Sequence, residues 1–202
     1  PTSVEFSNRG GEKVADSAYD ARRARATLGA CGGSHILHDG LHDALYVLLP
    51  LWAEAFGLSL AQVGLLKTVF TAAQATFQLP AGFLSERIGE RRLLVAGTIV
   101  AGLAYMLIAL VDGYLALAVL LSIVGLGSAV QHPLSSALVA RAFEAGRRRA
   151  ALGTYNFTGD LGKMTAAAAV GLTVAAIGWQ GAATGLGAIA VVVGFALFIA
   201  LR

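Results

Sequence analysis

The sequence predicts an all-α membrane protein with six transmembrane helices. Of its 202 residues, 56% are hydrophobic and only 13% are charged, and the mean hydropathy is +0.70. A water-soluble domain needs more polar residues than this to cover its surface. A helix needs about 20 apolar residues to span a bilayer. Six stretches of sufficient length lie at residues 27–54, 60–84, 92–111, 114–140, 149–177 and 180–201.

The loop charges predict the topology. Residues 1–26 are polar and lack the apolar core of a signal peptide, so we expect a flexible cytoplasmic tail. The turns after the first, third and fifth stretches contain no Lys or Arg, whereas those after the second and fourth are rich in arginine. The positive-inside rule predicts that both termini are cytoplasmic, and we expect the protein to lie in a bacterial-type inner membrane. The short connections favour antiparallel neighbouring helices.

The first stretch has one polar face. At about 100° per residue, His35, His38, Asp39, His42 and Tyr46 fall within roughly a third of the helix circumference. A charge in hydrocarbon costs about 2.5 to 3.5 kcal/mol even on lenient scales. Such a face is therefore expected to line a cavity or to contact other polar groups.

Three interpretations of this cluster, which also includes Asp43, stay open. Imidazoles with an unperturbed pKa of about 6.5 beside carboxylates can load and release a proton near neutrality. Alternatively, His38 and His42 with Asp39 could bind a divalent metal ion. The side chains could also form a static network, with Lys67 of the second stretch as a counter-ion.

Three further stretches carry polar side chains. In the fourth, Pro133 removes a backbone donor and is predicted to kink the helix. The third and sixth stretches have no ionisable residue in their interiors, so we expect helices one, two, four and five to line a cavity. The residues predicted to face it are Lys67, Thr71, Gln74 and Gln78 in the second stretch, Gln131, His132 and Ser135 in the fourth, and Asn156, Asp160 and Lys163 in the fifth.

Asp160 and Lys163 admit two readings because they are three residues apart on one predicted helix. They could simply pair with each other. Alternatively, Lys163 contacts an anionic substrate while Asp160 exchanges a proton.

A charged loop rich in glycine, Gly82–Arg92, joins the second and third stretches. It resembles the signature loop of the major facilitator superfamily, Gly-x-Leu-(Ser/Ala)-Asp-(Arg/Lys)-x-Gly-(Arg/Lys)-(Arg/Lys), which lies between the second and third membrane helices. Glu86 replaces the usual Asp, and Glu90 reverses the usual charge. The matching residues are Gly82, Leu84, Ser85, Arg87, Gly89 and Arg91, and Arg92 ends the loop.

The resemblance implies that this latch loop, Gly82–Arg92, holds one conformation of a transporter. Gly82 is expected to allow close helix approach and Gly89 to permit a tight turn with positive φ. We expect the Glu86 carboxylate to reach a helix N-terminus or an arginine.

Two further segments are similar to one branch of that superfamily, the fosmidomycin-resistance-like proteins. The run at residues 125–133, Gly-Leu-Gly-Ser-Ala-Val-Gln-His-Pro, is similar to their fourth helix, and Gly-Asp-Leu-Gly at 159–162 is similar to their fifth. The Gly-Pro pair of antiporter-type fifth helices is replaced here by alanines at 166–169.

The resemblance covers about residues 27–202, which is one half of a usual member with its two six-helix repeats. We expect an N-terminal fragment of a longer carrier, or a natural half that pairs with itself or with another half. A lone half would expose polar stripes to lipid, which is costly. The expected partners are therefore the lipid bilayer, a small-molecule substrate, protons and a second six-helix half.

The function expected from these observations is proton-coupled efflux or exchange of a small polar or anionic organic molecule by alternating access. The alternatives are a non-transporting accessory subunit and a metal-ion transporter. We expect no enzyme, since Ser128 and His132 share one helix without a Gly-x-Ser-x-Gly frame, and no cofactor or nucleic-acid partner. The expected proton-coupling residues are Asp39, Asp43, Asp160, His35, His38, His42 and His132; the expected substrate or counter-ion contacts are Lys67, Gln74, Gln78, Gln131, Asn156 and Lys163.

Overall fold

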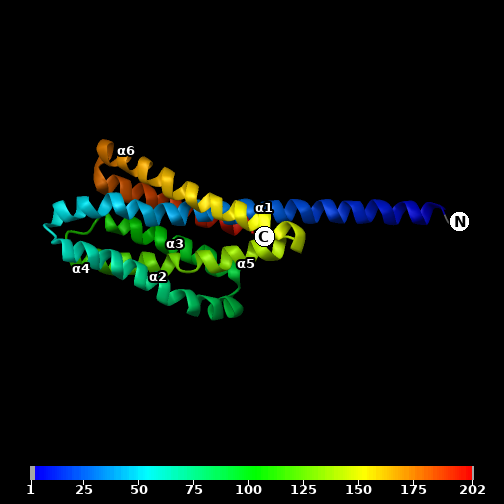
Figure 1. The fold of residues 1–202 in the computed structure, drawn as a ribbon, viewed down its shortest axis with the longest axis horizontal. Coiled ribbons are helices and arrows are strands. Elements are labelled where there is room, and N and C mark those ends of the chain that lie inside the picture. Colours follow the sequence, from blue (N-terminus) through cyan, green and yellow to red (C-terminus); the bar gives the residue numbers. More distant parts are fainter. Residues whose placement is uncertain (1–2, 202) are drawn as a thin grey trace.

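The computed structural model describes the backbone of residues 3–201 and the side chains of residues 20–201, and that range is helical apart from short turns (Figure 1). Helices α4 and α5 together form the predicted fourth span, and α6 contains the fifth and sixth. The six-pass, all-α prediction is therefore confirmed. The helices are α1 (Ser3–Phe56), α2 (Leu60–Ile88), α3 (Glu90–Ile108), α4 (Tyr114–Ser128), α5 (Gln131–Ala142) and α6 (Ala145–Ala200).

Two breaks have local causes. The α4–α5 break lies at residues 129–130, and Pro133 has no N–H to bond the carbonyl of Ala129, one turn earlier. Ala129 and Val130 keep helical φ and ψ values, so the break lies in the hydrogen bonding, and the predicted kink stays a prediction. In α6, Gly178 has φ 74° and ψ 173°, a conformation that favours glycine. The chain reverses there between the fifth and sixth spans.

Three described segments are long and apolar enough to cross a membrane: Glu90–Ile108, Tyr114–Ala142 and Ala145–Ala200. Helices α1 and α2 do not meet the same hydropathy criterion. Their polar stripes explain this, because His, Asp, Lys and Gln side chains lower the mean hydropathy of a helix that faces a polar interior.

The N-terminal segment differs in part from the expectation of a flexible tail at residues 1–26. Helix α1 begins at Ser3 and includes residues 20–26. The side chains of residues 1–19 lie outside the described residues. The boundary between a tail and a membrane domain therefore stays a prediction.

The helices pack through small residues and one large apolar core. A Cβ on Gly97 of α3 would lie 2.5 Å from the carbonyl oxygen of Gly127 in α4, and one on Gly102 would lie 2.7 Å from that of Gly187 in α6. Such close approach is typical of membrane helices. The core includes the buried Trp52 of α1. Contacts of α6 with both α1 and α3 place the fifth and sixth spans against the first and third.

Candidate functional site

The candidate site centres on Asp39, a buried carboxylate of α1 whose side chain is 8% exposed. Three basic side chains from three helices surround it. Its Oδ2 atom lies 3.3 Å from His35 Nε2 and 3.3 Å from Lys163 Nζ in α6, and its Oδ1 atom lies 3.4 Å from His132 Nε2 in α5. The side chains of His132 and Lys163 are 41% and 43% exposed. The carboxylate is thus buried behind two basic groups that remain accessible.

Lys163 divides its ammonium group between two carboxylates. Besides Asp39, it donates to Asp160 Oδ1 at 3.1 Å. The Asp160 side chain is 70% exposed, so the predicted Asp160–Lys163 pair exists and is extended inward by Asp39. The Lys163 ammonium therefore joins a buried carboxylate to an exposed one.

The His35–Asp39 contact offers a position for a proton. His35 Nδ1 lies 2.9 Å from the backbone carbonyl oxygen of Tyr155, and a carbonyl only accepts, so Nδ1 donates to it. The other ring nitrogen, Nε2, faces the Asp39 carboxylate oxygen at 3.3 Å. A proton between these two atoms would allow a hydrogen bond from one to the other.

The backbone of α6 makes room for this pair at Gly159. A Cβ there would lie 2.5 Å from His35 Nε2 and 2.7 Å from Asp39 Oδ2. The ring of His35 also stacks on Tyr155 with centroids 4.2 Å apart, and it contacts His132 edge-on at 5.0 Å. Glycine at 159 allows α1 and α6 to approach closely enough for these contacts.

His38 points away from Asp39 and has a different environment. Its Nε2 lies 3.0 Å from Thr98 Oγ1, and that hydroxyl donates to the carbonyl of Leu94. Thr98 therefore accepts from Nε2–H, which leaves Nδ1 to accept from Ser128 Oγ at 3.2 Å. A neutral, buried His38 satisfies both nitrogens and links α1 to α3 and α4.

A second polar group lies one turn along α1, nearer its C-terminal end. His42 Nδ1 lies 3.0 Å from Asp43 Oδ1, and Lys67 Nζ of α2 lies 3.1 Å from His42 Nε2. The ammonium of Lys67 also lies 4.5 Å from the ring centroid of Tyr46 and 5.5 Å from that of Phe70, as in cation–π contacts. Lys67 therefore contacts this polar group through the His42 imidazole, and its role as a counter-ion stays a prediction.

The remaining predicted contacts are more dispersed. The buried Gln131 donates to the Tyr155 hydroxyl at 3.2 Å, while its Oε1 atom has no partner among the described residues. Gln78 and Asn156 are exposed and Gln74 is half-buried. These three do not join the Asp39 cluster.

The metal ligands proposed from sequence do not converge. His38 bonds two hydroxyls and His42 bonds Asp43 and Lys67. The described residues that could hold an ion are instead His35, Asp39 and His132, whose ligand atoms all lie within 4.8 Å of one another. The Lys163 ammonium contacts the same carboxylate, so a cation already neutralises it.

The latch loop forms a sharp turn, with Gly89 at φ 93° between α2 and α3, as predicted. Glu86 and Arg87 are exposed and make no ion pair with another described residue. Glu90 instead pairs with Arg141 at the end of α5. The expected close approach at Gly82 is not observed, since no other element lies within 4 Å of its Cβ position.

The guanidinium of Arg91, also in the latch loop, donates to the backbone carbonyl of Phe198 and lies 4.5 Å from its ring centroid. Arg92 is exposed. Together with the Glu90–Arg141 pair, the Arg91 contact ties the start of α3 to the ends of α5 and α6.

Sequence reasoning missed the contributions of Thr98, Tyr155 and Gly159. Thr98 is a polar residue in an otherwise apolar stretch, which was a usable signal. The carbonyl of Tyr155 carries no side-chain signal, because a backbone acceptor is present at every residue.

The sequence of this chain is similar to that of known membrane transporters. The family model described as Major Facilitator Superfamily matches residues 33–202. The fosmidomycin resistance protein of Escherichia coli K12 is 29% identical over 77% of this chain and 40% of its own length. A probable sulfoacetate transporter of Cupriavidus necator is 28% identical over 71% of this chain and 33% of its own length. The Bacillus subtilis hexuronate transporter is 26% identical over 68% of this chain and 33% of its own length.

Solved structures agree on the fold. A bacterial homologue of the human lysosomal transporter Spinster, in an inward-facing and occupied conformation, superposes with a TM-score of 0.77 at 20% identity, over 87% of this chain and 43% of that one. The POT family transporter PepTSo superposes with a TM-score of 0.76 at 17% identity, over 88% of this chain and 37% of that one. The chain thus spans less than half the length of these relatives. It belongs to the Major Facilitator Superfamily and has the six-helix fold of one half of such a protein.

Proposed function

We propose that this chain is one half of a secondary active transporter that couples protons to the movement of a small organic anion by alternating access. The observation that carries the proposal is the Asp39 cluster. One buried carboxylate contacts His35, His132 and Lys163, and two of these basic groups are accessible from outside the six-helix unit. An intramembrane charge cluster of this kind is costly and marks a substrate or ion pathway.

An anionic substrate fits the accessible part of the cluster. Lys163 and His132 can both donate to a carboxylate or sulfonate group, which would compete with Asp39 for them. Two of the relatives carry the names of organic anions, sulfoacetate and hexuronate, as the compounds that they transport. The exposed Asn156 of α6, which lies about two helical turns before Lys163, is available for hydroxyl groups of such a substrate.

Proton coupling follows from the same competition. When a substrate takes Lys163 and His132, Asp39 loses the ammonium group and one imidazole, and binding a proton would neutralise the carboxylate. When the substrate leaves, Lys163 returns and the extra proton can be released. His42, Asp43 and Lys67 form a second polar group, between α1 and α2, which is a further candidate for proton exchange. The direction of transport, efflux or uptake, does not alter the linkage between substrate and proton.

The test is transport by the carrier reconstituted in proteoliposomes with its second half. Asp39→Asn should abolish flux driven by a pH gradient, because an amide cannot exchange the proton. We expect a loss of at least about 100-fold, in line with the 10²–10⁴-fold effect of removing a proton-transfer group. Asp112→Asn, in the exposed α3–α4 turn, is the matched control and should keep wild-type flux.

The non-transporting accessory subunit makes the opposite prediction. If wild-type protein, correctly assembled with its partner half, shows no substrate-dependent proton movement, the transport proposal fails. Proton-coupled flux that persists in Asp39→Asn would instead refute the role of Asp39. Metal-ion transport is less favoured, because Lys163 already contacts the carboxylate that an ion would need.

A further inference from the structure

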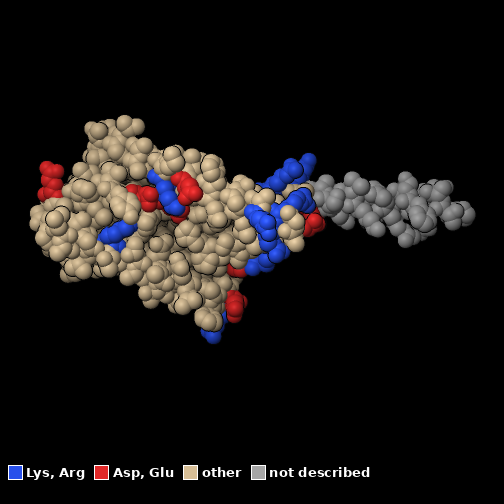
Figure 2. All heavy atoms as spheres, in the orientation of Figure 1, with Lys and Arg blue, Asp and Glu red and all other residues tan. Residues whose placement is uncertain are grey.

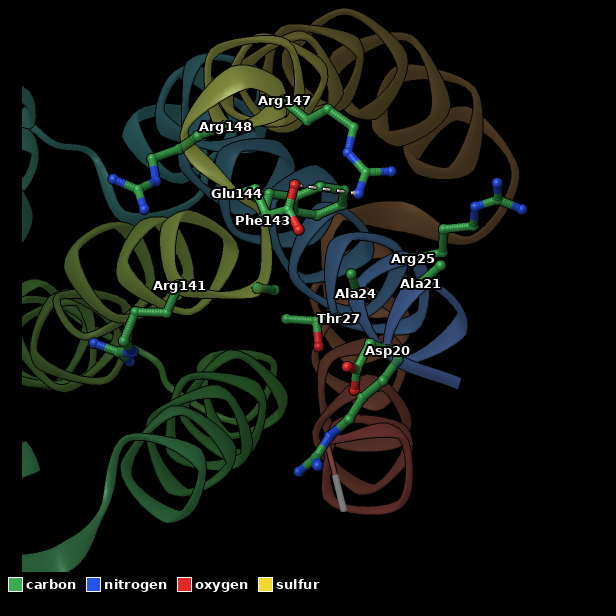
Figure 3. A pocket seen from close by; sticks show the side chains of 12 residues that line it. Asp20, Ala21, Ala24, Arg25, Thr27, Arg141, Phe143, Glu144, Arg147 and Arg148 are labelled. Atoms are coloured by element: carbon green, nitrogen blue, oxygen red, sulfur yellow. Dashed lines mark ion pairs between the residues drawn. The ribbon is translucent and has the colours of Figure 1, made fainter. Parts of the chain in front are cut away.

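A pocket of about 610 Å³ lies at the arginine-rich end of the molecule, remote from Asp39. Figure 3 shows that its walls come from two segments far apart in the sequence: the N-terminal part of α1, and the connection from α5 to the first turn of α6. Arg25 lies on one side, Arg141 on the opposite side, and Arg147 with Arg148 above. The lining residues are Asp20, Ala21, Arg23, Ala24, Arg25, Thr27, Arg141, Ala142, Phe143, Glu144, Arg147 and Arg148.

The pocket has an excess of positive charge. Five arginines line it against two carboxylates, Asp20 and Glu144. Arg141 is paired with Glu90, and Arg147 lies 3.9 Å from Glu144. The other three, Arg23, Arg25 and Arg148, make no ion pair with another described residue. Their guanidinium groups are thus available to an anion.

The start of α6 lies at the same pocket. Glu144 is its N-cap residue, and no side chain caps the helix. The backbone N–H groups of Arg147 and Arg148 donate to the Glu144 carbonyl, so they are not available to a ligand. The positive end of the helix dipole still favours a nearby anion, and the arginine side chains provide the hydrogen-bond donors.

The location of the pocket indicates which kind of anion it could bind. The pocket lies where the apolar first and fifth spans begin and the fourth ends, at the depth of lipid headgroups. On the face shown in Figure 2, Lys and Arg gather at this end of the body, whereas most of the remaining surface carries no charge. The wall also includes the apolar Ala21, Ala24, Ala142 and Phe143, which suit a glycerol backbone beside a phosphate.

We propose that this arginine pocket binds the phosphate of an anionic phospholipid from the adjacent leaflet. Guanidinium groups bind phosphate in a bidentate manner, and basic pockets between membrane helices are suited to anionic headgroups. Binding would join the N-terminal part of α1 to the α5–α6 connection. The pocket is separate from the Asp39 site, so the proposal does not depend on transport.

The experiment measures lipid retention by the full chain purified in detergent, using native mass spectrometry after exposure to phosphatidylglycerol or phosphatidylcholine. Wild-type protein should retain phosphatidylglycerol preferentially. The double variant Arg25→Gln/Arg148→Gln should retain at least tenfold less of it, because two charge-assisted contacts between guanidinium and phosphate are lost. The control Arg22→Gln/Arg149→Gln removes the same charge from the same helices outside the pocket and should behave as wild type.

Several outcomes would overturn the proposal. Equal retention of the two lipids by the wild type would show that the pocket does not select an anionic headgroup. Equal losses in both double variants would indicate general charge attraction. Pocket-dependent binding of inorganic phosphate, measured by calorimetry, with unchanged lipid retention would identify a free-phosphate site instead. If the pocket variant fails to fold, two other measurements test the proposal. One is the comparison of the two lipids on the wild-type protein. The other is lipid retention by the charge-retaining variant Arg25→Lys/Arg148→Lys, which is expected to keep the lipid.

Discussion

The two buried histidines of α1, His35 and His38, differ in what their second ring nitrogen contacts. His35 donates to a carbonyl and directs its other nitrogen at the Asp39 carboxylate. His38 has one hydroxyl acceptor and one hydroxyl donor, Thr98 and Ser128. The first contact joins a basic group to an acidic one, which is the arrangement that the proposed proton coupling needs. At His38 a second proton would leave Ser128 without an acceptor nitrogen, so we assign it a structural role.

This assignment predicts that Thr98→Val destabilises the fold without changing proton coupling. Valine has a similar shape but cannot accept from His38 Nε2–H, and an unsatisfied buried donor costs about 1–3 kcal/mol. The melting temperature in detergent should fall, while the pH dependence of flux stays that of wild type. Thr173→Val, at a partly exposed position of α6, should change stability by less than about 0.5 kcal/mol. A shifted pH profile in Thr98→Val would contradict the structural role.

The close approach of α1 and α6 at Gly159 leads to a second prediction for a single residue. In Gly159→Ala the new methyl would meet His35 and Asp39 at 2.5–2.7 Å, so α1 and α6 must separate. We expect a loss of about 1–3 kcal/mol in stability, together with reduced proton-coupled flux. Gly153→Ala is the matched control in the same helix, since nothing lies within 4 Å of its Cβ position. It should be neutral or stabilise by up to about 1 kcal/mol, and equal effects of the two substitutions would refute the close-contact argument.

At the scale of elements, the Glu90–Arg141 pair connects the start of α3 with the end of α5. Glu90 is the residue at which the latch loop reverses the charge found in the superfamily pattern. The structure gives this reversal a physical partner, because Arg141 would repel a basic residue at position 90. The charged group at position 90 thus contacts another helix, α5, and not another residue of the latch loop.

We therefore predict a measurable coupling between these two side chains. Glu90→Arg alone should lower the melting temperature, and adding Arg141→Glu should restore most of the loss. The Arg141 side chain is 58% exposed, so the coupling free energy should be about 0.2–1 kcal/mol. A double-mutant cycle from melting curves measures it, and additive effects of the two substitutions would show that the pair contributes nothing.

The elements were largely predictable because their signals are local. Apolar length set the six spans, Pro133 marked the α4–α5 break, and Gly89 marked the tight turn. Which polar residues meet across helices was not predictable in the same way. His35 and His38 lie on one face by spacing, yet their partners come from α6 in one case and from α3 and α4 in the other. That choice depends on helix packing, including the close approach at Gly159, which one sequence does not reveal.

For the whole molecule, the distribution of polar groups indicates an uncovered face. His132, Lys163 and Asp160 are partly or largely exposed, and so is Asn156, although all four lie within predicted membrane spans. Each charge exposed to hydrocarbon costs about 2.5–3.5 kcal/mol. A second six-helix body on this face would enclose the site and provide the other side of a cavity.

This leads to a prediction about assembly. The chain in mild detergent should associate, either with a second copy or with a separate six-helix half, and burial of the Asp39 face should drive the contact. Native mass spectrometry measures the stoichiometry, and cysteine labelling of Asn156→Cys should slow at least tenfold on association. Leu172→Cys, at an exposed apolar position of the same helix, is the control and should label at an unchanged rate. A strictly monomeric, stably folded species would refute the requirement for a partner half, because the polar side chains would then tolerate the lipid-like environment alone.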